Sequence, residues 1–165
     1  MAEFTALIVT LSDRASKGVY EDKSGEVIID KLKAFFDNLK LNICFIKEII
    51  PDEPTFLQEL LEKHIDQKTN FIITTGGTGI GPRDITPEVV KPLLTKEIPG
   101  IMEIVRVKYG LQFASAALSR SIAGIAQESL IYCLPGSPKA VGEYMDEIMK
   151  TLLHCHKILH GGEDH

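Results

Sequence analysis

A glycine-rich segment and two aspartates are the residues whose types and spacing indicate chemistry in this sequence. Four glycines fall within residues 76–81, directly after the apolar and β-branched run 71–75, and Asp84 follows them. Closely spaced glycines can take positive φ values and turn successive backbone N–H groups toward one anion. The segment therefore predicts a phosphate site, although a dense glycine turn can also serve only to make a sharp bend. It is neither a P-loop nor a GxGxxG motif that opens a helix directly after a strand.

Asp52 takes a place like that of Asp84, because it also follows an apolar run, in the segment Pro51-Asp52-Glu53. Carboxylates beside a phosphate repel it unless a cation lies between them, and one or two carboxylates plus substrate phosphates are the usual ligands of Mg²⁺. The sequence thus predicts that Asp52 and Asp84 hold Mg²⁺. Two plainer interpretations stay open: Asp52 could be a turn residue, and Asp84 could pair with Arg83 or cap the following helix.

The tripeptide Ser119-Arg120-Ser121 places a guanidinium between two hydroxyls just before a predicted strand. Such a group can hold an anionic or polar heterocyclic ligand through charge-assisted hydrogen bonds. On its own the tripeptide is equally compatible with a surface ion pair.

Three histidines near the C-terminus invite a metal interpretation that their spacing does not favour. On a helix only His156 and His160 share a face, and no acid accompanies them, so we expect a solvated helix end that includes His154. The cysteines are odd in number and far apart, so we expect buried thiols rather than disulfides or a zinc site at Cys44, Cys133 and Cys155.

The elements that must position these residues alternate along the chain. Apolar runs predict strands over 4–11, 41–50, 71–75, 121–125 and 130–134, of which the last two could pair locally or extend the sheet. Apolar residues at helical spacing predict helices over 27–36, 55–65, from Thr86, over 100–117 and over 137–159. A long loop precedes the first helix, and 161–165 are expected to form a frayed tail.

This order of elements predicts an α/β fold, a three-layer sandwich with a mostly parallel central sheet flanked by helices, as a single domain over 1–165. Ligands of an open parallel sheet bind beyond the carboxyl ends of its strands. Segments 12–14, 51–53, 76–84 and 135–137 fall at that edge. We therefore expect the glycine segment and both aspartates to face one cleft.

Composition narrows the classes of partner. With 18 Lys+Arg against 23 Asp+Glu the net charge is -5, which argues against nonspecific binding of nucleic acid. No window approaches the 18 apolar residues of a membrane span, and the first residues lack the basic flank and cleavage site of a signal peptide. We expect a cytoplasmic protein with no nucleic-acid or membrane partner.

Taken together, the motifs resemble those of the molybdopterin adenylyltransferases in the MogA/MoaB family of molybdenum-cofactor biosynthesis proteins. The family's order and spacing are matched by SDRASKGVYEDKSG, IPDE, TTGGTGIGPRDITPE, EIPG, ALSRSIAGI and LPGSPKAV. The resemblance implies a homotrimer that uses MgATP to adenylate the terminal phosphate of molybdopterin and releases pyrophosphate. It also allows a molybdenum-insertion protein as a further partner.

Carried over residue by residue, the resemblance implies catalytic and Mg²⁺-holding roles for Asp52 and Asp84. The molybdopterin contacts that it implies are Gly76, Gly77, Thr78, Gly79, Ser119, Arg120, Pro135, Gly136 and Ser137. The nucleotide contacts that it implies are Ser12, Asp13, Thr75 and Gly81.

Two other classes of function stay open at this stage. A noncatalytic molybdopterin-binding or scaffold module would need the glycine segment but not both aspartates, and this chain has both. A nucleotide hydrolase with the same phosphate site would turn over ATP without molybdopterin.

Overall fold

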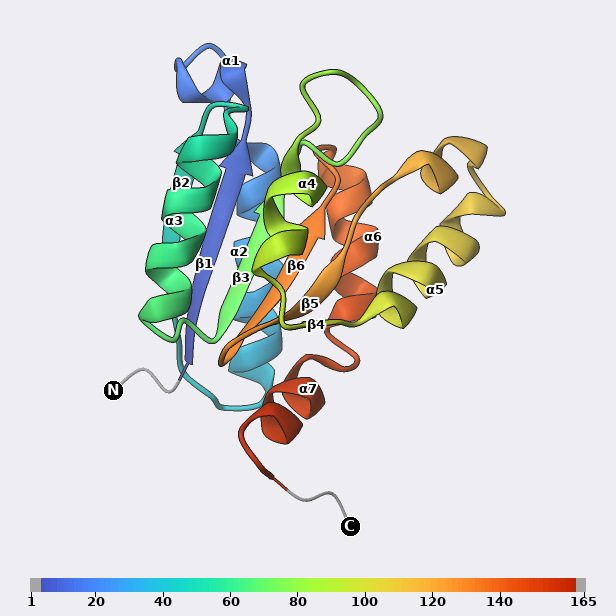
Figure 1. The fold of residues 1–165 in the computed structure, drawn as a ribbon. Coiled ribbons are helices and arrows are strands. Elements are labelled where there is room, and N and C mark those ends of the chain that lie inside the picture. Colours follow the sequence, from blue (N-terminus) through green and yellow to red (C-terminus); the bar gives the residue numbers. More distant parts are fainter. Residues whose placement is uncertain (1–3, 163–165) are drawn as a thin grey trace.

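The computed structural model describes residues 4–162, and its centre is one six-stranded sheet in the order β2-β1-β3-β6-β5-β4 (Figure 1). The strands are β1 (Phe4–Leu11), β2 (Ile43–Ile50), β3 (Phe71–Thr75), β4 (Lys96–Glu97), β5 (Ala123–Ala126) and β6 (Ser129–Leu134). Strands β2, β1, β3 and β6 are parallel, whereas β5 and β4 each run antiparallel to their neighbour. The predicted mostly parallel sheet is confirmed.

Helices cover both faces of the sheet (Figure 1). They are α1 (Asp13–Ser16), α2 (Lys23–Asn38), α3 (Pro54–Asp66), α4 (Thr86–Val90), α5 (Pro99–Gly110), α6 (Pro138–Ile148) and α7 (Leu152–Leu159), with 3₁₀ turns η1 (Lys91–Leu93) and η2 (Ala114–Leu118). Side chains of β1 alternate between two cores: Ala6 and Ile8 pack with α2 and α6, whereas Leu7 and Val9 pack with α3 and α4. This is the expected three-layer sandwich.

The N-terminal half follows the predicted pattern with local differences that capping explains. The helix predicted over 27–36 begins earlier, at Lys23, because the Asp22 carboxylate accepts a hydrogen bond from Gly25 N at 2.9 Å. The predicted long loop contains α1, whose first turn is capped by the Ser12 hydroxyl. Neither short-range cap changes the order of the elements.

The C-terminal half departs further from the prediction. The helix predicted over 137–159 is interrupted, because both the N–H and the hydroxyl of Thr151 donate to the Ile148 carbonyl, at 3.1 and 3.3 Å, and compete with the helical pattern. The helix predicted over 100–117 ends at Gly110 and is followed by η2. The hairpin of β5 and β6 both pairs locally and extends the sheet, and β4, two exposed residues long, was not predicted.

The cysteine prediction holds only in part. Cys133 is buried in β6, Cys155 is half-buried, and Cys44 is exposed because β2 is an edge strand of the sheet. Of the expected tail, 163–165 lie outside the described residues. No helix formed by residues 4–162 has the length and apolar character needed to cross a membrane.

The expectation of a solvated histidine cluster is wrong for His156, which helps to attach α7 to the sheet. Its ring lies 5.1 Å from that of Phe4 and 5.6 Å from that of Phe71, and Nε2 lies 3.2 Å from Asn70 Nδ2. The ring of His160 lies 4.3 Å away and is tilted by 45°. Burial lowers the pKa of His156, and the charge of His160 lowers it further.

We predict that the chain loses stability as pH falls from about 7 to about 5. Because the native pKa of His156 is lowered, the unfolded chain binds a proton first, so stability is full above the unfolded pKa of about 6.5 and declines as pH falls toward the native value. His64, whose pKa burial also lowers, adds to this slope. Thermal unfolding followed by circular dichroism should show a smaller pH dependence for His156→Gln, and an unchanged dependence would contradict the assignment.

Candidate active site

A cavity of about 750 Å³ lies at the carboxyl ends of β1, β3 and β6. The structure brings most of the sequence-predicted site residues together in its wall. Those that line it are Ser12, Asp52, Thr75, Gly76, Gly77, Thr78, Gly79, Asp84, Ser119, Pro135, Gly136 and Ser137. Asp13, Gly81 and Arg120 are not among the lining residues.

Glycine is required where the loop leaves β3. Gly76 and Gly77 have φ values of 101° and 66°, and a Cβ on Gly76 would lie 2.4 Å from the carbonyl oxygen of Leu11. A Cβ on Gly77 would lie 2.4 Å from Oγ1 of Thr86, whose hydroxyl donates to Gly76 O at 2.8 Å. The loop is therefore pressed between the end of β1 and the start of α4.

Protein acceptors hold the N–H groups at the two ends of this loop. Gly76 N donates to Leu134 O at 3.1 Å, and Gly81 N donates to Asp84 Oδ2 at 2.7 Å. An anion that binds the loop must therefore use donors between these ends, in 77–80. The predicted phosphate site is confined to this part of the glycine segment.

Arg120 supports the glycine loop and does not line the cavity. Its Nε donates to Gly79 O at 2.6 Å, its Nη2 donates to Asp84 O at 2.8 Å, and its Nη1 forms an ion pair with Glu88. Its own backbone N–H donates to Thr78 O at 2.9 Å. The sequence could not reveal these partners, because three of the four are backbone carbonyls of a loop whose path depends on the fold.

Asp84 adopts neither of the two plainer roles considered for it. Its Oδ2 accepts the hydrogen bond from Gly81 N, while Arg83 pairs with Asp13 and Glu53 instead. The following residue, Ile85, is the N-cap of α4 and makes no side-chain cap. The carboxylate is held on the inner side of the loop, where it lines the cavity.

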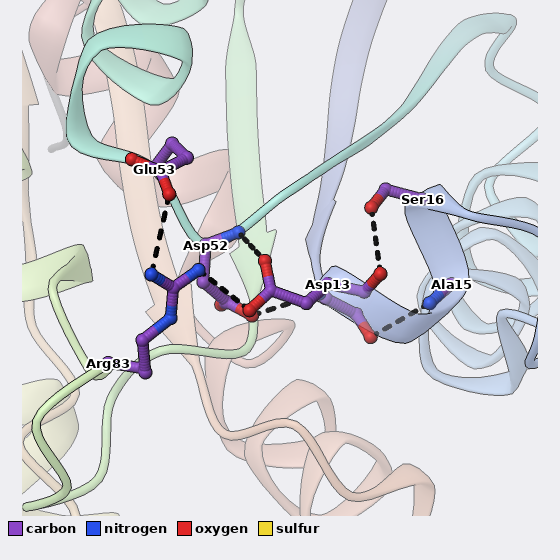
Figure 2. Close-up of polar contacts among 7 residues, drawn as sticks. Asp13, Ala15, Ser16, Asp52, Glu53 and Arg83 are labelled. Carbon is purple, nitrogen blue, oxygen red and sulfur yellow. Dashed lines mark hydrogen bonds and ion pairs between the residues drawn. The ribbon is translucent and has the colours of Figure 1, made fainter.

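Asp52 is bound reciprocally to Asp13 (Figure 2). Asp13 N donates to Asp52 Oδ2 at 3.0 Å, and Asp52 N donates to Asp13 Oδ1 at 3.1 Å. Burial raises the pKa of Asp52, and the charges of Asp13 and Asp84 raise it further. The hydrogen bond from the Asp52 backbone and the bond from Arg83 lower the pKa of Asp13.

The two carboxylates of the cavity suit Mg²⁺, which also takes phosphate and water ligands. They suit less well a metal whose ligands all come from the protein. Within the described part of the chain, no group of three or more His, Cys, Asp or Glu is placed to hold a metal ion. Asp52 and Asp84 offer two carboxylates on one cavity, and two hard oxygen ligands leave positions for phosphate oxygens and water. A closed zinc site would need four protein ligands.

One end of the cavity was not foreseen from the sequence. We call it the aromatic end, and it is lined by Tyr109, Phe113, Lys139 and Tyr144, which come from α5, α6 and the segment after α5. The Lys139 ammonium lies 4.0 Å from the ring centroid of Phe113, an arrangement that offers a flat heterocycle both a π-face and a charge. The apolar spacing of these helices gave no signal, because it indicates core positions equally well.

Comparisons with known proteins identify the family. A family model described as "Probable molybdopterin binding domain" matches residues 7–154. A molybdopterin adenylyltransferase of Helicobacter pylori (strain J99) is 39% identical over 155 residues, which make up 93% of this chain and 86% of the relative. Gephyrin of Dictyostelium discoideum is 38% identical over 159 residues, which make up 93% of this chain but 22% of gephyrin.

A solved structure agrees with the sequence comparisons. The molybdopterin biosynthesis enzyme MoaB of Thermus thermophilus superposes with a TM-score of 0.85 at 35% identity, covering 96% of this chain and 97% of that one. The family model spans most of the chain, and the Helicobacter relative aligns with it almost from end to end. The fold, the order of the motifs and these matches agree, and the chain belongs to the MogA/MoaB family of molybdenum-cofactor biosynthesis proteins.

Proposed function

We propose that this chain transfers an adenylyl group from MgATP to the terminal phosphate of molybdopterin, releasing pyrophosphate, in molybdenum-cofactor biosynthesis. The observation that carries this proposal is that Asp52 and Asp84 line the same cavity as the glycine loop. A site that brings two polyanions together needs backbone donors for phosphate and carboxylates for the accompanying cation. The printed name of the Helicobacter relative, molybdopterin adenylyltransferase, supports the same activity.

The reaction asks the protein for positioning and charge balance rather than covalent chemistry. An oxygen of the molybdopterin phosphate forms a bond to the α-phosphorus of ATP, and the bond from that phosphorus to the bridging oxygen breaks, releasing pyrophosphate. The attacking oxygen is already ionised at neutral pH, so no side chain must remove a proton. Bound Mg²⁺ would neutralise phosphate charge, with Asp52 and Asp84 as the protein groups that hold it.

The residues that line the cavity come from several strand ends, and we assign different groups of them to the two substrates. Residues 77–79 and 135–137 surround one part of the cavity and are proposed to bind the molybdopterin phosphate. Ser12 and Asp52 are proposed to lie on the nucleotide side. The Thr75 hydroxyl, also expected there, donates to Pro135 O at 2.7 Å, in the part proposed for molybdopterin. Asp13 and Gly81 were expected to contact the nucleotide directly. Neither residue lines the cavity, and this position does not support such a contact.

The decisive experiment is incubation of the chain with molybdopterin and MgATP, followed by mass spectrometry of the pterin. Adenylylated molybdopterin supports the proposal. Molybdopterin binding without product would indicate a noncatalytic binding module, such as a part of a longer protein. Hydrolysis of ATP in a control without molybdopterin would indicate a nucleotide hydrolase.

We predict that Asp84→Asn lowers the rate of adenylyl transfer on the order of 100-fold while molybdopterin still binds. Asparagine keeps an oxygen that can accept the hydrogen bond from Gly81 N, so the loop should keep its shape, but the charge that attracts the cation is lost. Single-turnover kinetics measures the rate of adenylyl transfer, and calorimetric titration measures the affinity for molybdopterin. Transfer at the parent rate in limiting Mg²⁺ would show that Asp84 has another role.

A second prediction concerns Arg120 and its support of the glycine loop. Arg120→Ala should lower the free energy of unfolding by about 1–2 kcal/mol and weaken molybdopterin binding, because two loop carbonyls lose their donors. Glu88→Gln, which leaves those two hydrogen bonds in place, is the matched control and should have a smaller effect. Urea unfolding and calorimetry provide the measurements. Lost binding with parent-like stability would instead favour direct contact between Arg120 and the ligand.

We also propose that the chain forms a homotrimer, as the family resemblance implies. Apolar side chains of α5 and the segment after it are exposed, and these are Ile104, Val107, Leu111 and Leu118. Light scattering should give about three chains per particle, a closed cyclic assembly. Leu111→Lys, at a side chain that is 86% exposed, should reduce the particle size without unfolding the subunit. A concentration-independent monomer would refute the proposal.

A molybdenum-insertion protein is the proposed recipient of the product.

A further inference from the structure

Asp13 lies behind Asp52, and both of its carboxylate oxygens are engaged by the protein (Figure 2). Oδ1 accepts from Asp52 N at 3.1 Å, and Oδ2 accepts from Arg83 Nη2 at 2.7 Å. Asp13 is not among the residues that line the cavity. A side chain in this position is suited to hold Asp52 and poorly suited to contact a substrate.

The Asp13 backbone also binds Asp52, through the Asp52 carboxylate. Its N–H donates to Asp52 Oδ2 at 3.0 Å, so that oxygen has a fixed partner and the other oxygen, Oδ1, is left to serve the cavity that Asp52 lines. A carboxylate with one oxygen fixed loses the freedom to rotate between ligand-directed and solvent-directed positions. The two reciprocal hydrogen bonds thus set the direction of Asp52.

Arg83 connects this pair to the glycine loop. It precedes Asp84 in the chain, and it binds both Asp13 and Glu53, the residue that follows Asp52, with Nη1 lying 3.3 Å from Glu53 Oε1. The guanidinium therefore spans from the loop that carries Asp84 to the two segments that carry Asp13 and Asp52 (Figure 2). It also offsets the repulsion between neighbouring carboxylates.

We propose that the side chains of Asp13 and Arg83 are positioning groups that fix the backbone at Asp52 and, through it, the placement of the Asp52 carboxylate relative to Asp84. The role rests on the proposed adenylyl transfer, because it is the joint action of the two acids on one substrate phosphate that requires the placement. Asp13 thereby acts through Asp52 and not as a nucleotide contact.

Glu53 offers a matched control, because its carboxylate binds the same guanidinium as that of Asp13, whereas the acceptor of the Asp52 N–H is Asp13. Asp13→Ala should increase amide-proton exchange at Asp52, measured by NMR, by about tenfold or more, since the acceptor of that N–H is removed. Asp13→Asn keeps an acceptor and should restore slow exchange. Glu53→Ala should leave the exchange at Asp52 at the parent rate.

Kinetics separate positioning from direct binding. Asp13→Ala should reduce kcat for adenylyl transfer by about tenfold or more. The affinity for ATP in the absence of Mg²⁺ should match the parent, and Glu53→Ala, which leaves Arg83 bound to Asp13, should lower kcat less than Asp13→Ala does. A parallel loss of ATP affinity in Asp13→Ala would overturn the proposal in favour of a direct nucleotide contact.

The two measurements also distinguish failure of this proposal from failure of the proposed function. If the parent chain makes no adenylylated product, the function is wrong, but the exchange rates still test the link between Asp13 and Asp52. Parent-like exchange at Asp52 in folded Asp13→Ala would overturn the positioning role. Should Asp13→Ala fail to fold, Arg83→Ala, at a side chain 56% exposed, is expected to fold and to lower kcat, and an unchanged kcat would contradict the proposal.

Discussion

The close approach of the glycine loop to the end of β1 is the constraint on which the rest of the site depends. At Gly76 a single added carbon would lie 2.4 Å from the Leu11 carbonyl, so the backbone itself forms the wall between two strand ends. This approach lets Ser12, Thr75 and Pro135 line one cavity although they belong to different parts of the chain. It also places Thr86 where its hydroxyl can hold the loop from the opposite side. Next to Gly76 the wall of the cavity is consequently formed by backbone, in contrast to the aromatic end.

The charged groups around the cavity differ in what they can reach. The carboxylates of Asp52 and Asp84 line it, whereas the guanidinium groups of Arg83 and Arg120 lie outside the lining and bind protein oxygens. Lys23 and Lys139 also line the cavity, so its wall carries charges of both signs. Two carboxylates suit a phosphate that arrives with a cation. A chain with a net charge of -5 therefore still presents ammonium groups to the polyanionic substrates proposed for it.

The sequence allowed the fold and the location of the cavity to be predicted, but not the roles of several side chains. Continuous apolar runs such as 71–75 identify buried parallel strands, and the edge where they end follows from topology. The break at Thr151 and the docking of His156 depend on contacts that the folded chain creates, so apolar spacing could not predict them. The same reason applies to the hydrogen bonds of Asp13 with Asp52 and Arg83, on which its proposed positioning role rests.

The aromatic end of the cavity has a different structural origin from the phosphate-binding part. Tyr109 and Phe113 belong to α5 and the turn that follows it, whereas the glycine loop depends on contacts with β1 and α4. Under the proposed function, substitutions at the aromatic end can therefore alter which heterocycle fits without disturbing the backbone proposed to bind phosphate. Selection can then change the preferred pterin or base through α5 and the turn after it, while the glycine loop, which has no room for a side chain at Gly76, stays as it is.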